Sequence, residues 1–397
     1  MDRGAAIERE PPLDWAAVGG EPVTWGGRAV AVVDTGLLWN LTAGGQFVFG
    51  PGCALGPGSP DCAVLWHRNF LTGLDNDLSR PTDEFLRGLH GTWVSAIAYR
   101  VAPSAGLVGL KVLGDRADRE DFERVLQALD WVAEHALQFG IVAVNISLAV
   151  ARQGEAVLRQ EPCREEAELV ARVRRLWCER DVLVVAASGN DRRTDALTVP
   201  ACVPGVVSVG AVYDAADFAP SKCTDTAFPD RVACFSNTAP FLKLLAPGER
   251  ITTGIFQDLG REGEGAGTSA AAPHVSGAIA ALRGVGGFEE DSAACTLARL
   301  VRTGRVVTDH RSGLQFPRID LAAAAATLPT STGDCNFDGR VTANEIERAV
   351  DILLARAPRI VCPNADGNGD GAVTIEEIVA AVNVRLHACP LGLVGVA

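Results

Sequence analysis

The sequence predicts a three-layer α/β domain with a mainly parallel sheet, followed by a small all-α module. Three observations carry this prediction. Continuous apolar runs bounded by turn residues recur along most of the chain, stretches with helical periodicity separate some of them, and an acidic motif repeats near the C-terminus. Apolar runs without alternation are typical of strands that are buried on both faces of a parallel sheet.

Expected strands and helices alternate along the chain. Strands are expected at residues 29–33, 106–113, 141–148, 182–188 and 205–212. Between the second and third strands, an apolar stripe over 122–137 predicts a helix that stops at Gly140. A second helix is expected over 165–180. In such a sheet, functional sites gather at the carboxyl ends of the strands.

Composition limits the class of protein. With 397 residues, of which 48% are hydrophobic, the chain can bury one large core and still form a second, smaller module. The net charge of -13, from 36 basic and 49 acidic residues, gives no sign of nucleic-acid binding. No apolar run has the length that a membrane span needs.

The eleven cysteines indicate disulfides and an oxidising, extracellular compartment. Several lie in close pairs along the chain, namely Cys53 with Cys62, Cys163 with Cys178, and Cys223 with Cys234. The odd count leaves at least one thiol free or intermolecular. The first 20 residues contain no apolar signal region, so we expect that processing has removed the export signal or that the start is incomplete.

Polar residues follow two of the expected strands. Asp34 comes directly after the first strand and Asn190 after the fourth, so both are expected at the same edge of the sheet. Each also has a plain structural interpretation, because Asp34 can form a turn before Gly36 and "SGND" can be an ordinary loop.

The stretch "GEGAGTSAAAPHVSG" places Ser269 at the start of an alanine-rich helix, with His274 five residues later. Five residues rotate a helix by about 140° beyond a full turn, which points His274 away from Ser269. We therefore expect His274 to be structural. Taken alone, Ser269 could simply cap the helix.

After an Ala/Thr/Pro/Ser tract at residues 321–333, the chain repeats itself at a period of 32. Each repeat places oxygen ligands at positions 1, 3, 5, 7 and 12 of an EF-hand loop, with glycine at the sharp turn. The predicted calcium ligands are Asp334, Asn336, Asp338, Arg340 through its carbonyl and Glu345, and then Asp366, Asn368, Asp370, Ala372 through its carbonyl and Glu377. Calcium is the expected cofactor.

Four stretches, "VAVVDTGL", "HGTWVSAIA", "VVAASGND" and "GTSAAAPHVSG", resemble in order and spacing the motifs of the subtilisin-like serine proteases. The likeness covers roughly residues 22–327. It implies Asp34, His90 and Ser269 as the catalytic triad and Asn190 as a donor to the oxyanion. In these roles His90 takes the proton of the serine hydroxyl, which is a weak nucleophile without a base, and Asp34 holds the imidazole.

Some residues depart from the family pattern. The resemblance implies a substrate-binding edge made by Ser147, Leu148, Ala149, Val150 and Gly189. Ala149 and Val150 stand where the family commonly has glycines, so we expect a narrowed primary pocket. Trp93 replaces a histidine beside His90, and Ala270 replaces a methionine after Ser269.

The C-terminal duplication of a loop followed by a helix resembles dockerin modules, which implies a cohesin-like partner. The expected organisation is an N-terminal segment at 1–21, a subtilisin-like peptidase domain at 22–327, a linker at 328–333 and a dockerin-like EF-hand module at 334–397. The predicted function is that of a secreted serine endopeptidase acting on protein or peptide substrates. Two alternatives stay open: an inactive binding protein on the same fold, and an ester-cleaving or acyl-transferring relative.

Overall fold

This computed structural model describes twelve stretches of the chain, namely residues 27–43, 45–76, 89–114, 121–150, 157–216, 218–253, 264–284, 291–326, 332–333, 335, 341–367 and 371–385. Within them, ten strands form one sheet in the order β15-β16-β12-β11-β9-β7-β1-β6-β4-β5. Their bounds are β1 Ala29–Asp34, β4 Val64–Asn69, β5 Leu74–Asp75, β6 Gly106–Lys111, β7 Ile141–Ile146, β9 Leu183–Ala187, β11 Val207–Val212, β12 Leu244–Pro247, β15 Arg305–Thr308 and β16 Gln315–Arg318.

The sheet is mainly parallel, as the continuous apolar runs predict. Neighbouring strands from β4 to β16 run parallel, and only the edge strands β5 and β15 pair antiparallel. The central strands β1, β6, β7, β9 and β11 are buried at every residue. Their carboxyl ends therefore lie along one edge, where the polar side chains of the candidate site emerge.

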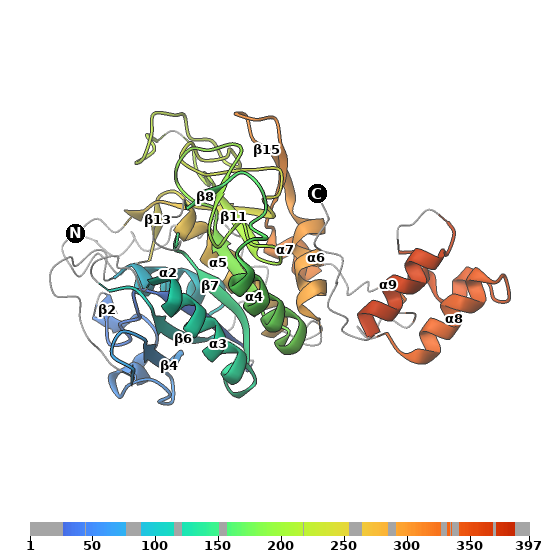
Figure 1. Cartoon of the computed structure of the whole chain (residues 1–397), viewed down its shortest axis with the longest axis horizontal. Helices are drawn as coiled ribbons and strands as arrows, with labels where there is room; N and C mark the ends of the chain where they lie inside the picture. Colours follow the sequence, from blue (N-terminus) through green and yellow to red (C-terminus); the bar gives the residue numbers. More distant parts are fainter. Residues whose placement is uncertain are drawn as a thin grey trace, which may run out of the picture.

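Helices cover both faces of this sheet (Figure 1). The larger helices of the domain are α2 His90–Val101, α3 Asp121–Phe139, α4 Ala167–Arg180, α5 Thr268–Gly284, α6 Ala293–Thr303 and α7 Leu321–Ala326. Residues of β1 alternate between two cores: Val30 and Val32 pack with α2 and α5, whereas Ala31 and Val33 pack with α3 and α4. This alternation produces the predicted three layers.

The predicted end of α3 is confirmed. Gly140 follows the last helical residue with φ of 63°, a left-handed conformation that favours glycine. A Cβ at this position would lie 1.9 Å from the carbonyl oxygen of Gly27, so only glycine fits between the helix end and the segment leading into β1.

In the described part of the chain, three short two-stranded sheets lie outside the large sheet. They are β2 Thr42–Ala43 with β3 Gln46–Phe47, β8 Leu158–Arg159 with β10 Leu197–Thr198, and β13 Ile251–Thr252 with β14 Glu264–Gly265. A 3-10 helix, η2, covers Pro51–Ala54.

The cysteine spacing left the disulfide connectivity open, and the structure shows that two of the three close pairs are bonded within the pair. Cys53 is bonded to Cys62 and Cys223 to Cys234. Cys163, however, is bonded to Cys202 and not to Cys178. The pairing of β8 with β10 and a backbone hydrogen bond from Cys163 to Cys202 (2.9 Å) bring these distant segments together, whereas Cys178 lies inside α4.

The described C-terminal residues form a small helical unit with its own core. Its elements are α8 Ala343–Leu353, the 3-10 turns η4 Arg359–Val361 and η5 Pro363–Ala365, and α9 Ile375–Arg385. The Cys335–Cys362 disulfide lies in this core beside Ala349, Ala365 and Val373. Figure 1 shows these helices set apart from the large sheet.

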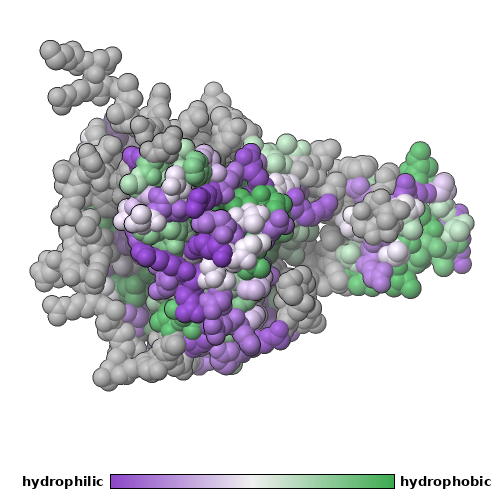
Figure 2. Space-filling view, turned by 90° about the horizontal axis from the view of Figure 1, so that it is seen from above, coloured by the Kyte–Doolittle hydropathy of each residue, from purple (hydrophilic) through white to green (hydrophobic). Residues whose placement is uncertain are grey.

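Exposed apolar side chains gather on this C-terminal unit (Figure 2). Ile360 is 82% exposed and Ile375 69% exposed, and Leu354 and Val379 are also exposed. Among the described residues, no helix has both the length and the apolar character needed to cross a membrane.

Candidate active site

Asp34 and His90 meet at the carboxyl edge of the sheet. Asp34 is the last residue of β1 and its side chain is completely buried, while His90 is the first residue of α2. The imidazole Nδ1 lies 2.8 and 3.0 Å from the two carboxylate oxygens of Asp34. The side chain of His90 keeps 27% of its surface exposed, so the protein does not enclose it fully.

Glycine after His90 is what allows this approach. A Cβ on Gly91 would lie 2.3 Å from the Gly36 carbonyl oxygen and 3.0 Å from the Asp34 Cβ. The Gly91 N–H instead donates to Thr35 Oγ1 at 2.9 Å, and the Thr35 N–H donates to Asp34 Oδ1 at 2.7 Å. The carboxylate and the start of α2 are therefore fixed by the same residue, Thr35.

The pair changes the proton affinity of His90. Burial lowers the pKa of His90, but the charge of Asp34 and its hydrogen bond raise it by more, so the pKa lies above the usual 6.5. Lys222 lowers this pKa in turn, because a nearby cation disfavours imidazolium. His90 is thus a base whose protonation depends on charges of both signs.

Ser269 lies in the first turn of α5 and is partly exposed. Gly267, just before the helix, has φ of 150° and donates its N–H to the Gly248 carbonyl at 2.8 Å. The Ser269 carbonyl accepts a hydrogen bond from Ser147 Oγ at 2.9 Å, and Ser147 accepts one from Asn145 Nδ2 at 3.0 Å. These contacts tie the start of α5 to the carboxyl end of β7.

The helices that carry His90 and Ser269 pack together beside these residues. Trp93, one turn after His90, shares a small apolar cluster with Ile251 and with Ala270, the residue after Ser269. The Trp93 ring lies 5.9 Å from the His90 ring, measured between centroids. The family-typical histidine is thus replaced by a buried ring that joins the two helix starts.

Asn190 is exposed after β9, and its amide has a fixed orientation. Its Oδ1 accepts from the Thr268 N–H at 2.9 Å and from Thr268 Oγ1 at 3.2 Å. The same hydroxyl accepts from the Gly189 N–H at 3.1 Å. Because the oxygen is engaged by Thr268, the Nδ2 group remains available as a donor next to Ser269.

The loop that carries Asn190 is held from below by Asn237, which is completely buried. Asn237 Oδ1 accepts from the N–H groups of Asp191 (2.8 Å) and Arg193 (3.1 Å), and its Nδ2 donates to the Ser188 carbonyl at 3.2 Å. Gly189 lies between these contacts with φ of 107°. A single buried amide therefore sets the path of residues 188–193.

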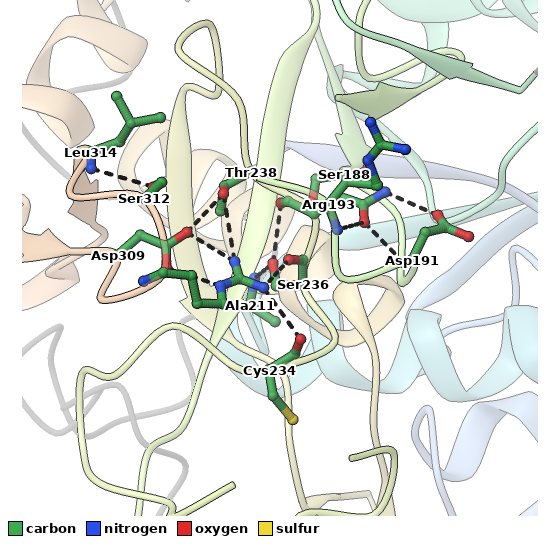
Figure 3. A network of polar contacts seen from close by, with 12 residues as sticks. Ser188, Asp191, Arg193, Ala211, Cys234, Ser236, Thr238, Asp309, Ser312 and Leu314 are labelled. Carbon is green, nitrogen blue, oxygen red and sulfur yellow. Dashed lines mark hydrogen bonds and ion pairs between the residues drawn. The ribbon is translucent and has the colours of Figure 1, made fainter. Parts of the chain in front are cut away.

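Figure 3 shows the next layer of this support. Asp309, in the turn between β15 and β16, accepts from Thr238 Oγ1 at 2.7 Å and from Arg311 Nη2 at 2.9 Å. Arg311 also donates to the carbonyl of Ser236 at 2.8 Å. The turn between β15 and β16 thus holds residues 236–238, the segment whose Asn237 positions the Asn190 loop.

Comparison with known proteins identifies the fold and the family. The family model described as the subtilase family matches residues 26–303. This chain belongs to the subtilase family. It is 29% identical over 196 residues to the major intracellular serine protease of Bacillus subtilis (strain 168), covering 48% of this chain and 50% of that protein. It is 28% identical over 246 residues to subtilisin-like protease 10 of Arthroderma otae, covering 62% of this chain and 53% of that protein.

The subtilase therefore spans about half the length of these two curated relatives. Two solved structures share its fold. The crystal structure of a cold-adapted subtilisin-like serine proteinase aligns with a TM-score of 0.50 at 21% identity, over 75% of this chain and 90% of that one. The subtilase cytotoxin SubAB structure aligns with a TM-score of 0.54 at 16% identity, over 80% of this chain and 94% of that one.

The predicted substrate-binding edge of this subtilase is only partly open. Ala149 is exposed and Leu148 half-buried, whereas Ser147 is buried beneath Ser269. Val150 is 6% exposed, packs in the core beside α3 and α4, and donates its N–H to the Val199 carbonyl at 3.0 Å. Contrary to the expectation from sequence, Val150 is therefore turned into the protein, and Ala149 is the added side chain that stays exposed.

His274 is structural in this subtilase, as its rotation from Ser269 predicts. It is 2% exposed, and its Nδ1 donates to the Ala270 carbonyl at 2.8 Å. Burial lowers the pKa of His274 to about 4, which keeps the ring neutral.

The predicted calcium ligands are described only in part. Asp334, Asn336, Asp338, Arg340, Asn368 and Asp370 lie outside the described residues. Glu345 and Glu377 stand at the twelfth loop positions and in the first turns of α8 and α9. Each accepts a hydrogen bond from the threonine just before its helix, from the Thr342 N–H at 2.7 Å and from the Thr374 N–H at 2.8 Å. Within the described part of the chain, no group of three or more acidic, histidine or cysteine side chains is arranged to hold a metal.

Proposed function

We propose that this subtilase is a serine endopeptidase that cleaves peptide bonds through Asp34, His90 and Ser269. The observation that carries the proposal is the contact of the buried Asp34 carboxylate with His90 Nδ1. Ser269 lies in the first turn of the neighbouring helix α5, and the side-chain amide of Asn190 is held in one orientation by Thr268. This arrangement supplies the parts of acyl transfer: a nucleophile, a base with its orienting carboxylate, and an oxyanion donor.

In this proposal the Asp34 hydrogen bond keeps the His90 proton on Nδ1, so that Nε2 can accept the proton of the Ser269 hydroxyl. Attack by Oγ forms a tetrahedral intermediate whose oxyanion accepts from Asn190 Nδ2 and the Ser269 N–H. His90 then protonates the leaving amine, and water releases the acyl group from Ser269 by the same steps in reverse.

The proposal is tested with matched peptide and ester substrates that carry the same acyl group. Mass spectrometry of the products should show internal peptide bonds cleaved by the unmodified protein and not by Ser269→Ala. Ester cleavage without peptide cleavage would favour the ester-cleaving alternative. Substrate binding without turnover of either would favour the binding-protein alternative.

We predict that activity rises with pH along an acid limb whose midpoint lies above 6.5. His90 must be neutral to act as a base, and its raised pKa delays loss of its proton until a higher pH. The measurement is kcat/KM against pH. A midpoint below 6.5 would contradict the role of the Asp34–His90 pair, and Asp34→Asn should move the midpoint down because the charge that raises the pKa is gone.

The substrate acyl side is proposed to lie along residues 147–150 and beside Gly189. The exposed Ala149 side chain supports a preference for slender residues before the scissile bond, because it occupies space that glycine would leave open. Val150 would act through packing, since it is buried.

We place the protein in an oxidising compartment outside the cytoplasm. The support is the set of disulfides in both parts of the chain: Cys53–Cys62, Cys163–Cys202, Cys223–Cys234 and Cys335–Cys362. The names of the relatives do not decide the matter, because the Bacillus protein is called intracellular. Free-thiol titration of the protein recovered from its native compartment tests the proposal.

Calcium is proposed as the ligand of the C-terminal unit, and one oxygen of Asp366 in the second loop supports it, although the other oxygen pairs with Arg359. Asp366 Oδ1 is buried with no hydrogen-bond partner in the described part of the chain. Its Oδ2 accepts from the Gly371 N–H at 2.9 Å, and Gly371 has φ of 96° at the sharp turn. An unpartnered buried carboxylate oxygen is costly, and oxygen ligands suit calcium.

We predict that calcium stabilises the C-terminal unit in the full chain. Binding to the folded state alone adds about 2.7 kcal/mol per site at a hundredfold excess over Kd. In scanning calorimetry, the unfolding temperature of the C-terminal unit should rise when calcium is added. The double variant Asp338→Ala with Asp370→Ala should show no such rise. Identical transitions in calcium and in excess chelator would contradict the assignment.

The same unit is proposed to attach the enzyme to a cohesin-like partner. Its exposed apolar residues, Leu354, Ile360, Ile375 and Val379, are the support (Figure 2). Pull-down of a cohesin domain with and without chelator tests this role. A unit that binds calcium and no cohesin would serve stability alone.

A further inference from the structure

Lys222 stands beside the candidate oxyanion site without being part of the catalytic set. An ideal Cβ placed on Gly267 would lie 3.2 Å from Lys222 Nζ and 3.5 Å from Asn190 Nδ2. The ammonium therefore lies on the same side of Gly267 as the amide of Asn190. It is also close enough to His90 for its charge to lower the pKa of that imidazole.

The lysine is held in place by its neighbours. Its carbonyl accepts from Arg192 Nη2 at 2.8 Å, and its ammonium lies 5.4 Å from the centroid of the buried Phe235 ring. The preceding Ser221 N–H donates to Glu249 Oε1 at 3.0 Å, and the following Cys223 is bonded to Cys234. These restraints fix the base of the side chain next to the site, although the residue itself is exposed.

Lys222 forms no close ion pair among the described residues, although the charge of Glu249 acts on it from nearby. Within the part of the chain that the structure describes, neither Lys222 nor Arg192 forms an ion pair, and Lys222 Nζ has no hydrogen-bond partner. Burial lowers the pKa of Lys222 and the charge of Glu249 raises it. In a chain with a net charge of -13, an unpaired cation at the site edge is available to a ligand.

The sheet order indicates which part of a substrate Lys222 would meet. The segment 147–150, proposed to hold the acyl side, follows β7, whereas Lys222 lies in the connection between β11 and β12. β9, which leads to Asn190, separates β7 from β11 in the sheet. Lys222 and the segment 147–150 therefore lie on opposite sides of Asn190. If the acyl part of the substrate lies along 147–150, the leaving peptide lies on the side of Lys222.

We propose that Lys222 selects substrates with an acidic side chain at the first or second residue after the scissile bond. This inference rests on the proposed endopeptidase function. A carboxylate at that place would accept a charge-assisted hydrogen bond from the ammonium, which is strengthened as the bound peptide excludes water. Basic residues at the same place would be repelled.

Quenched peptides that differ only by Glu or Gln at these two positions test the proposal. The unmodified protein should show a kcat/KM about 5- to 10-fold higher for Glu, and the ratio should fall with added salt. Lys222→Met should bring the ratio to about one, and Lys222→Arg should restore most of it because the charge returns. Lys243→Met is the control. Lys243 lies directly before β12, at the amino ends of the strands, whereas the candidate site lies at their carboxyl ends.

A Glu preference that survives in Lys222→Met would overturn the proposal. An equal loss on the Glu and Gln peptides would also overturn it, because Lys222 would then act on the oxyanion or on His90. If no cleavage depends on Ser269, the endopeptidase function fails and this inference with it. Ser269-dependent cleavage without a Glu preference overturns the inference alone.

Discussion

Ser269→Ala is expected to lower kcat by about 10⁶, a magnitude known from the corresponding change in subtilisin itself. The hydroxyl is the nucleophile that the proposal places beside His90, and the described neighbours of Ser269 named next offer no replacement. Ala270 is apolar, and the Ser147 hydroxyl is buried as a donor to the Ser269 carbonyl. The measurement is turnover of a quenched peptide under saturating conditions.

His90→Ala is the paired change and should cost about as much as Ser269→Ala. Because the two residues act as a unit, the double variant should be no slower than either single variant. His274→Ala is not a suitable control, since His274 is buried and its loss would leave a cavity. Additive losses, or an active His90→Ala protein, would show that a different residue is the base.

Asn190→Ala is expected to lower kcat by about 10² to 10³ with little change in KM, a range that also comes from subtilisin. The amide would act only on the developing oxyanion, because its oxygen is already engaged by Thr268 and only Nδ2 is available. Steady-state kinetics with one peptide give both constants.

The matched control for Asn190 is Arg193→Ala, which removes an exposed side chain from the same loop. Arg193 pairs with Asp195, also exposed, and the contacts of its backbone N–H with Asn237 are kept. The control should retain kcat. An Asn190→Ala protein in which KM rises and kcat is unchanged would mean that the amide binds substrate equally before and during reaction.

Much of the fold could be predicted because the central strands are buried on both faces. A continuous run such as 141–146 has few alternatives to a parallel strand, and β7 occupies it. By contrast, β4 has mixed burial and follows a loop-rich region, and it could not be recognised from its periodicity. The edge strand β15 and its neighbour β16 are also partly exposed, so periodicity could not identify them either.

The candidate site was predictable in its main residues and not in its supports. Asp34 and Asn190 stand at strand ends, which the pattern of apolar runs locates. Thr35, Asn237 and Asp309 act through contacts with residues distant in sequence, and these contacts depend on tertiary structure. The Cys163–Cys202 disulfide could not be predicted, because cysteine spacing does not determine connectivity and the pairing of β8 with β10 brings the two residues together.

The sequence also contains a local signal for the starts of the two C-terminal helices. Thr342 and Glu345 form a capping box at the start of α8, and Thr374 with Glu377 repeats these contacts at α9. The spacing of threonine and glutamate predicts such a helix start from sequence alone. The same glutamates stand at the twelfth positions of the proposed calcium loops, so one residue would serve both the helix and the cation.

Covalent labelling by a fluorophosphonate probe tests the proposed Asp34, His90 and Ser269 assembly most directly, because the probe reacts preferentially with an activated serine. Ser269 should be the labelled residue in a peptide map, the rate of labelling should rise with pH through the raised pKa of His90, and His90→Ala should label far more slowly. An intact, folded protein in which Ser269 stays unlabelled, or in which labelling is unchanged by His90→Ala, would contradict the assignment.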